Sequence, residues 1–167
     1  MITLTLEIQN NLFGMLAVLS RNSTDLRPAW PLIAEEFYRI EEEQFDSQGA
    51  RVNQWAELSH GYAKWKAINY PGQPILQRTG ALKNSLTNQH DANAIYDAQS
   101  DSLTLGTSLG YAQYHQAGEG KLPQRPPIEL RDDDFQKLGE IARDELQDMA
   151  LELGFGVVGF LGFGGRS

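Results

Sequence analysis

The sequence predicts an α+β fold, in which amphipathic helices pack on a small antiparallel β-sheet and a long helix closes the chain. Three patterns predict it. Residues 1–9 alternate between apolar and polar side chains, as a half-buried strand does. Residues 92–98 and 103–107 have the composition of two strands joined by a short hairpin loop. From Phe135 to Leu153, apolar residues recur every three or four positions, as on one face of a helix of about five turns.

The first element expected is the strand over residues 1–9, and an amphipathic helix follows it. Asn10 and Asn11 can cap that helix, which ends near Arg21. Residues 22–25 then form a turn and a new cap. The apolar positions of the strand are Ile2, Leu4, Leu6 and Ile8, and those of the helix are Leu12, Met15, Leu16 and Leu19.

A second helix follows, with an irregular start because Pro28 and Pro31 both fall there. Its apolar stripe consists of Trp30, Ile33, Phe37 and Ile40. The opposite face carries five glutamates: Glu35, Glu36, Glu41, Glu42 and Glu43. They are nearly contiguous, so they fan around the helix, and no histidine is near them. We therefore interpret them as a solvated face and not as a metal site.

The middle of the chain is predicted to alternate loops with short helices. Residues 51–58 form an ordered loop that inserts Trp55 into the core. Residues 59–69 form a short helix, and residues 70–74 are a turn cluster. Near Thr79 the pattern allows either a short capped helix or a tight Thr-Gly turn. The apolar face of the 59–69 helix holds Tyr62, Trp65 and Ile68, with Lys64 and Lys66 beside it.

The stretch from residue 111 to residue 131 is too irregular for plain core. Tyr111 and His115 are four residues apart, so one helical turn places them on the same face. Gly118 and Gly120 provide a hinge. The prolines after them favour an extended edge segment over residues 122–130, which is able to pair with an exposed sheet edge on a neighbour.

Charge is unevenly distributed along this chain of net charge −8. Residues 1–46 carry three basic and eight acidic side chains, a net of −5, and residues 132–167 carry the same numbers. Residues 47–131 carry eight basic and six acidic side chains, a net of +2. The acidic character of the two end segments argues against a surface that binds nucleic acid. It suits a surface along which DNA passes without being bound, or it simply keeps the protein soluble.

We expect one domain over residues 1–153 and a glycine- and phenylalanine-rich tail over residues 154–167. The tail has three interpretations: a disordered end, a segment that orders on a neighbouring subunit, or a peptide that touches a membrane. No apolar run is long enough to span a bilayer, and residues 1–9 do not have the pattern of a signal peptide. The chain contains no cysteine, which excludes disulfides and thiolate chemistry.

The sequence gives little support to an enzyme. None of the three histidines, His60, His90 and His115, is paired with another at metal-ligand spacing. The chain has no Gly-x-Ser-x-Gly elbow and no phosphate-binding glycine loop. A triad need not be local, so it cannot be read from one sequence. We predict a protein without catalytic residues, cofactor or metal, and we interpret His115 as a histidine satisfied by a backbone carbonyl.

Several short motifs occur in an order that resembles a known family. They are Phe45, Gly49, Trp55 and Leu58; Lys64 or Lys66; Ile75-Leu76, Thr79-Gly80-x-Leu82 and Ser85; Tyr111-Ala112, His115-Gln116 and Gly118; and Arg125-Pro126, before a closing helix. This order, over residues 30–150, resembles the virion morphogenesis (tail completion) proteins of Mu-like tailed phages. Pro127 and Ile128 depart from the family, which usually has an aromatic residue there, and so does the glycine-phenylalanine tail.

The resemblance implies a structural protein that joins or finishes the tail at the head–tail junction. It implies a homo-oligomeric ring, contacts with tail tube, terminator or head-completion proteins, and a place in the virion after assembly in the host cytoplasm. We expect no sequence-specific nucleic acid binding and no membrane association. The predicted interface residues are Thr79, Gly80, Leu82, Tyr111, His115, Gln116, Arg125 and Pro126. The alternatives are a small phage-associated hydrolase of cell-wall polymer and a host-encoded adaptor.

Overall fold

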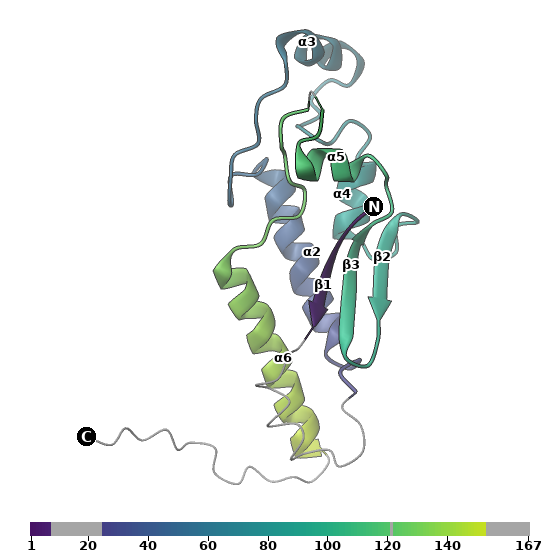
Figure 1. Ribbon diagram of the computed structural model, residues 1–167, viewed down its shortest axis with the longest axis vertical. Coiled ribbons are helices and arrows are strands. Elements are labelled where there is room, and N and C mark those ends of the chain that lie inside the picture. Colours follow the sequence, from purple (N-terminus) through teal and green to yellow (C-terminus); the bar gives the residue numbers. More distant parts are fainter. Residues whose placement is uncertain (8–24, 121, 153–167) are drawn as a thin grey trace, which may run out of the picture.

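The predicted α+β class is confirmed by a computed structural model, which describes residues 1–7, 25–120 and 122–152. The predicted helix over residues 12–21 and the predicted tail over residues 154–167 lie outside the described residues. The elements are, in order, β1 (Ile2–Glu7), α2 (Trp30–Asp46), α3 (His60–Asn69), α4 (Ala81–Thr87), β2 (Ala94–Ala98), β3 (Ser102–Thr107), α5 (Ala112–Ala117) and α6 (Asp132–Glu152) (Figure 1).

The sheet has three antiparallel strands in the order β1-β3-β2, so the N-terminal strand pairs with the second strand of the predicted hairpin. Leu4 lies opposite Leu105, and Leu6 lies opposite Leu103. Because side chains alternate between faces, this register places the four leucines on one side of the sheet. Thr5 and Thr104 are paired on the other side, where their hydroxyls are 3.2 Å apart.

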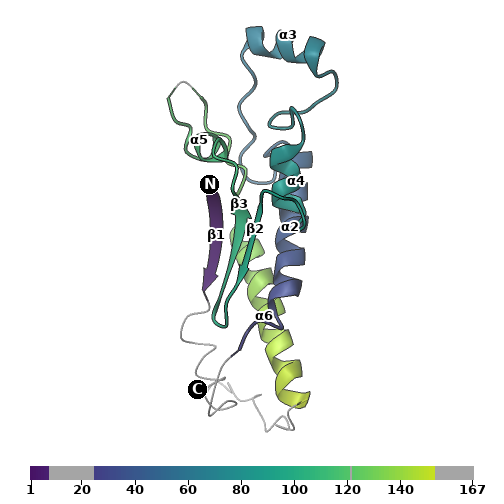
Figure 2. The same ribbon diagram turned by 90° about the vertical axis from the view of Figure 1, so that its right-hand side faces the viewer.

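Helices α2 and α6 cover the leucine face of the sheet, as the side view shows (Figure 2). The stripes that the sequence predicted on both helices supply the buried residues of this main core. Those of α2 are Trp30, Ile33, Ala34 and Phe37, and those of α6 are Leu138, Ala142 and Leu146. The predicted long C-terminal helix is confirmed.

Helix α2 is fixed to the hairpin at its first residue. The indole Nε1 of Trp30 donates to the carbonyl of Gln99 at 2.7 Å, and the backbone amide of Leu26 donates to the carbonyl of Ser100 at 2.8 Å. Pro31 falls in the first turn of the helix, where an amide has no intrahelical acceptor to lose. The residues just before Trp30 form a turn, in which the amides of Ala29 and Trp30 donate to carbonyls three residues back at 3.0 and 3.4 Å, so the predicted irregular start is confirmed.

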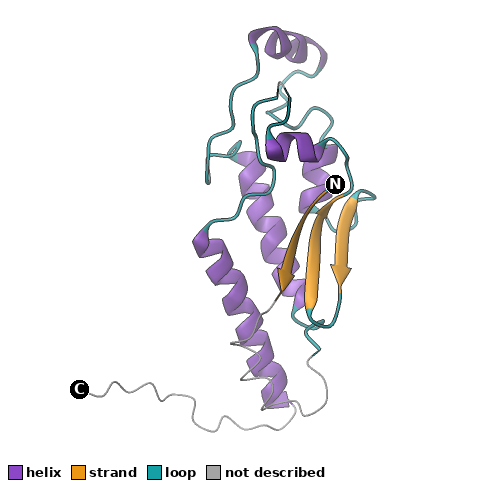
Figure 3. Cartoon of the chain, viewed as in Figure 1, coloured by secondary structure: helices purple, strands orange, loops and turns teal. Residues whose placement is uncertain are grey.

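A second, smaller core lies beyond the end of α2 and contains Trp55, as predicted. Its buried members are Phe45, Trp55, Leu82, Leu86 and Ala112. Gly49 has a φ of +87°, and a Cβ there would lie 2.4 Å from the Trp55 ring, so both the backbone and the packing require glycine. The loop of residues 47–59 leads from α2 to α3, and hydrogen bonds join it to the segment that leads from α5 to α6 (Figure 3).

Glu41 corrects the interpretation of the glutamates on α2 as one solvated face. Glu35, Glu42 and Glu43 are exposed, but Glu41 is 0% exposed. Neither of its carboxylate oxygens has a hydrogen-bond partner among the described residues. Burial raises the pKa of Glu41 well above its ordinary value of 4.5, against the opposing effect of Arg51. The apolar face of α2 widens at its C-terminal end, and the 3.6-residue period alone did not reveal this.

We expect Glu41→Met to raise the free energy of unfolding at pH 7 by about 1–3 kcal/mol, because it removes a buried carboxyl group without partners. The folded protein keeps the proton on Glu41 to a higher pH than the unfolded chain does. The contribution of Glu41 to the free energy of unfolding therefore falls as the pH rises above 4.5. The gain in stability from Glu41→Met should be smaller at pH 4 than at pH 7.

Urea unfolding at pH 4 and pH 7 measures both effects. Glu42→Met is the matched control, because Glu42 is exposed on the same helix, and its change should stay within about 0.5 kcal/mol. Equal gains from Glu41→Met at the two pH values would show that folding does not raise the pKa of Glu41.

Candidate functional site

Helix α3 stands at one end of the molecule, beyond the sheet and the main core. The predicted helix is confirmed, and its predicted apolar face lies on the surface. Tyr62, Trp65 and Ile68 are 41%, 43% and 74% exposed. The ring of Tyr62 stacks on that of Trp65 with centroids 5.5 Å apart, and Tyr70 extends the aromatic row at 5.7 Å from Trp65. Aromatic side chains gathered on a surface are typical of protein interaction sites.

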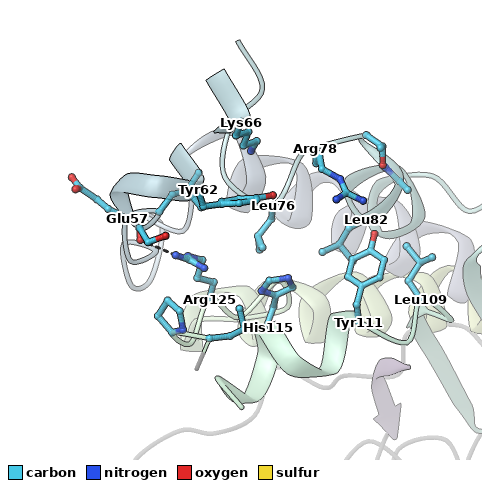
Figure 4. Close-up of a pocket in the computed structure, with 16 residues that line it drawn as sticks. Glu57, Tyr62, Lys66, Leu76, Arg78, Leu82, Leu109, Tyr111, His115 and Arg125 are labelled. Atoms are coloured by element: carbon cyan, nitrogen blue, oxygen red, sulfur yellow. Dashed lines mark hydrogen bonds between the residues drawn. The ribbon is translucent and has the colours of Figure 1, made fainter. Parts of the chain in front are cut away.

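An open hollow of about 870 Å³ lies between α3, α4, α5 and the loop that follows α5. We call it the hollow. It is lined by Glu57, Leu58, Ser59, Tyr62, Lys66, Leu76, Arg78, Thr79, Ala81, Leu82, Leu109, Tyr111, His115, Leu122, Pro123 and Arg125. Its residues come from four separate stretches of sequence, which meet only because the second core holds the loops together (Figure 4).

The charged residues that line the hollow are mostly basic. Lys66, Arg78 and Arg125 lie in its wall, against the single carboxylate of Glu57. Arg78 is exposed, and its guanidinium lies 5.7 Å from the centre of the Tyr70 ring. The ammonium of Lys66 is buried and donates to the carbonyl of Pro74. Burial lowers the pKa of Lys66, and the nearby arginines lower it further. The hollow therefore favours a ligand with negative charge.

Tyr111 and His115 project from α5 into the hollow, one helical turn apart. Their rings meet edge to face with centroids 6.4 Å apart, which agrees with their predicted place on the same face. The Nδ1 of His115 is buried and has no hydrogen-bond partner among the described residues, so the expected carbonyl contact is not found at that nitrogen. Burial lowers the pKa of His115 below 6.5, and Arg125 adds to this. The imidazole is therefore neutral at pH 7.

Arg125 holds the wall of the hollow in place. Its side chain is 5% exposed, and it donates to the carbonyl of Ala56 at 2.7 Å and to that of Glu57 at 2.8 Å. Both acceptors lie in the loop that leads into α3. The position of α3 thus depends on a guanidinium from the other side of the hollow.

Gln116 and Pro126 hold the loop after α5 in place through hydrogen bonds. The amide of Gln116 donates to the carbonyl of Ile128 at 2.8 Å and accepts from its backbone amide at 3.2 Å. The carbonyl of Pro126 accepts from the indole of Trp55 at 3.1 Å. Residues 122–130 are irregular and partly buried, so the predicted free strand for a neighbour's sheet edge is not present. Gly118 and Gly120 have φ values of +70° and +69°, which favour glycine, and a Cβ at Gly118 would lie 2.8 Å from Gln124.

Both alternatives for the Thr79 region hold in part. Gly80 has a φ of +79° and forms a turn, and α4 begins immediately after it. The hydroxyl of Thr79 lies 3.5 Å from the amide of Ala81, so it is at most a weak cap. Leu82 is 1% exposed and connects the hollow to the second core.

The structure brings most of the predicted interface residues together. Thr79, Leu82, Tyr111, His115 and Arg125 line the hollow, and Gly80, Gln116 and Pro126 lie beside or behind it. Their role in an interface stays a prediction. Sequence reasoning missed Tyr62, Lys66 and Arg78 as members of this site. The aromatic residues and lysines of α3 predicted a helix with one apolar face. They did not indicate which part of the molecule that face would lie beside.

Comparison with known proteins agrees with the resemblance found in the motifs. The model of the phage virion morphogenesis family matches residues 8–147. The chain belongs to the phage virion morphogenesis family. No curated protein and no solved structure matches it significantly.

Membership of the virion morphogenesis family gives the chain a structural role in making the phage particle. Among the helices that the structure describes, none is long and apolar enough to cross a membrane. Within residues 1–7, 25–120 and 122–152, no three His, Cys, Asp or Glu side chains are grouped closely enough to hold a metal ion.

Arg125→Ala should destabilise the fold as well as open the hollow. The change removes two charge-assisted hydrogen bonds and leaves the carbonyls of Ala56 and Glu57 without donors, at a cost of about 2–4 kcal/mol. Chemical denaturation gives the loss of stability, and protease cleavage within residues 56–60 reports the release of α3. Arg78→Ala is the matched control, since Arg78 donates no hydrogen bond among the described residues. Equal stability of the two variants would contradict this role for Arg125.

Proposed function

We propose that this chain is a tail-completion or head–tail joining subunit that acts by protein–protein assembly, within a ring of identical copies. Its family supports the general role, and the hollow beside the exposed aromatic face of α3 supports the mode of action. The position of the hollow beside the exposed aromatic face of α3 is the single observation that carries the proposal. A protein that works by docking needs a specific surface with aromatic and arginine anchors, and this end of the molecule has one.

The partners in this proposal are further copies of the chain and neighbouring virion proteins, of the tail tube, terminator or head-completion type. A closed ring requires two different surfaces on each copy, so that each subunit contacts the next by the same rotation. The end formed by α3 and the hollow differs in shape and charge from the end formed by the last turns of α6. Two unlike ends support the proposal of contacts between different surfaces of neighbouring copies.

No observation favours the alternative of a cell-wall hydrolase. Glycoside hydrolysis generally needs two carboxyl groups that flank the bond to be cleaved. The hollow contains one, Glu57, from the loop before α3. The buried carboxyl of Glu41 belongs to α2 and does not line the hollow. We retain assembly as the proposed function.

Tyr111→Ala should leave the protein folded and reduce the yield of complete phage particles. Tyr111 is 44% exposed, so its loss should change the free energy of unfolding by less than about 1 kcal/mol. Its ring forms part of the docking surface, where aromatic truncations are among the costliest. Complementation of a phage lacking the gene, with particles counted by electron microscopy, measures the effect. Tyr96→Ala is the control, because Tyr96 is similarly exposed on the edge strand β2. Equal yields from the two variants would contradict the proposal.

We also expect no tight binding to duplex DNA at physiological salt. The net charge is −8, and the exposed acidic side chains of α2 and α6 repel phosphates. In this proposal those faces flank a passage for DNA and do not hold it. Fluorescence anisotropy with a labelled duplex at about 150 mM salt tests the point. Submicromolar binding would exclude such a passage surface.

A further inference from the structure

Helix α6 carries a strongly acidic surface that the fold does not use. Eight of its residues are acidic and two are basic, a net charge of −6. Leu138, Ala142 and Leu146 face the main core. A line of exposed acidic side chains follows the helix outside this core face at spacings of four residues: Glu140, Asp144 and Asp148.

These carboxylates are largely free to bind a partner. All three are exposed, and Asp144 pairs only with its neighbour Arg143, at 3.3 Å. Glu140 and Asp148 form no ion pair with any residue that the structure describes. Like charges on successive turns of one helix disfavour each other unless an opposite charge comes near. A basic partner would relieve that repulsion.

The basic counterpart lies at the other end of the molecule. The hollow has three cationic side chains in its wall, Lys66, Arg78 and Arg125, against the one carboxylate of Glu57. Two perpendicular views place α3 at one end of the long axis and the last turns of α6 at the opposite end, and the hollow lies beside α3. The two surfaces cannot meet within one copy of the chain.

We propose that the hollow of one copy receives the acidic line of α6, Glu140, Asp144 and Asp148, from a second copy. This inference rests on the proposed function and names the contact that builds the ring. Charge complementarity selects the occupant: the chain itself supplies the acidic helix that the basic hollow fits. The aromatic rim, with Tyr62 and Tyr111, would pack on the aliphatic stems of the docked side chains.

The geometry of this contact has a consequence for assembly. Because the hollow and the acidic line are different surfaces, the contact is heterologous, and each copy has one free surface of each kind. Repetition of such a contact closes a ring when the rotation between copies allows it. A protein partner other than a second copy, or a nucleic acid, would leave the acidic line of α6 unsatisfied. The net charge of −8 also disfavours nucleic acid in the hollow.

Charge reversal in full-length protein tests the inference. Wild-type protein should self-associate at low ionic strength, as measured by sedimentation, and added salt should weaken the association. Arg78→Glu in the hollow and the double variant Glu140→Lys/Asp148→Lys in α6 should each raise the dissociation constant about tenfold or more. An equimolar mixture of the two variants should restore association, because alternating copies then present matched charges at every contact.

The controls make the same charge changes elsewhere on the surface. Lys64→Glu lies on α3 but does not line the hollow, and Glu42→Lys/Asp101→Lys reverses two exposed carboxylates outside α6. Both controls should associate like wild type. A monomeric wild type at low salt, failure of the mixture to restore association, or equal effects of the controls would each overturn the inference.

Particle yield separates this inference from the proposed function. If Arg78→Glu lowers the yield of particles while self-association is unchanged, the hollow binds another virion protein; the inference then fails and the assembly role stands. If Arg78→Glu and Tyr111→Ala both leave the yield unchanged, the assembly role itself fails. Binding of labelled duplex DNA that Arg78→Glu abolishes would assign the hollow to nucleic acid and overturn the inference.

Discussion

The indole of Trp55 holds together the end of the molecule that carries α3 and the hollow. Its ring meets Phe45 edge to face at 5.4 Å and fills the space left by the glycine at position 49. Its Nε1 donates to the carbonyl of Pro126, so one side chain joins the loop after α2 to the loop after α5. Without this junction, the walls of the hollow would have no common support, since α3 itself contributes no buried apolar side chain.

In the loops, polar side chains hold the chain in one arrangement, as apolar packing does in the main core. Arg125 and Gln116 each bind backbone groups of a segment distant in sequence, with distances between 2.7 and 3.2 Å. Buried hydrogen bonds of this kind specify one arrangement, because every alternative leaves polar groups without partners. The hollow is thus built from loops and yet has a defined shape. Such a surface can present aromatic rings to a partner with little loss of conformational freedom on binding.

The sequence predicted the regular elements well because each has a period that matches its burial. Leu4, Leu6, Leu103 and Leu105 alternate, and they fall on one face of the sheet in the register found. It predicted less about surfaces. Glu41 lies among four other glutamates and is buried, because α2 is covered by loop 47–51 and by α6 near its end. Tyr62, Trp65 and Ile68 have the spacing of a core stripe and are exposed. Periodicity shows that side chains share a face, but not what covers that face.

The chain distributes its apolar residues unequally between the sheet with α2 and α6 and the end that carries α3. Helices α2 and α6 bury theirs on the sheet, and this core does not need α3. Helix α3 keeps two large aromatic rings on the surface, which lowers solubility. An arrangement with that cost is consistent with selection for contact with a partner. Such a contact fits the structural role of the phage virion morphogenesis family, to which the chain belongs.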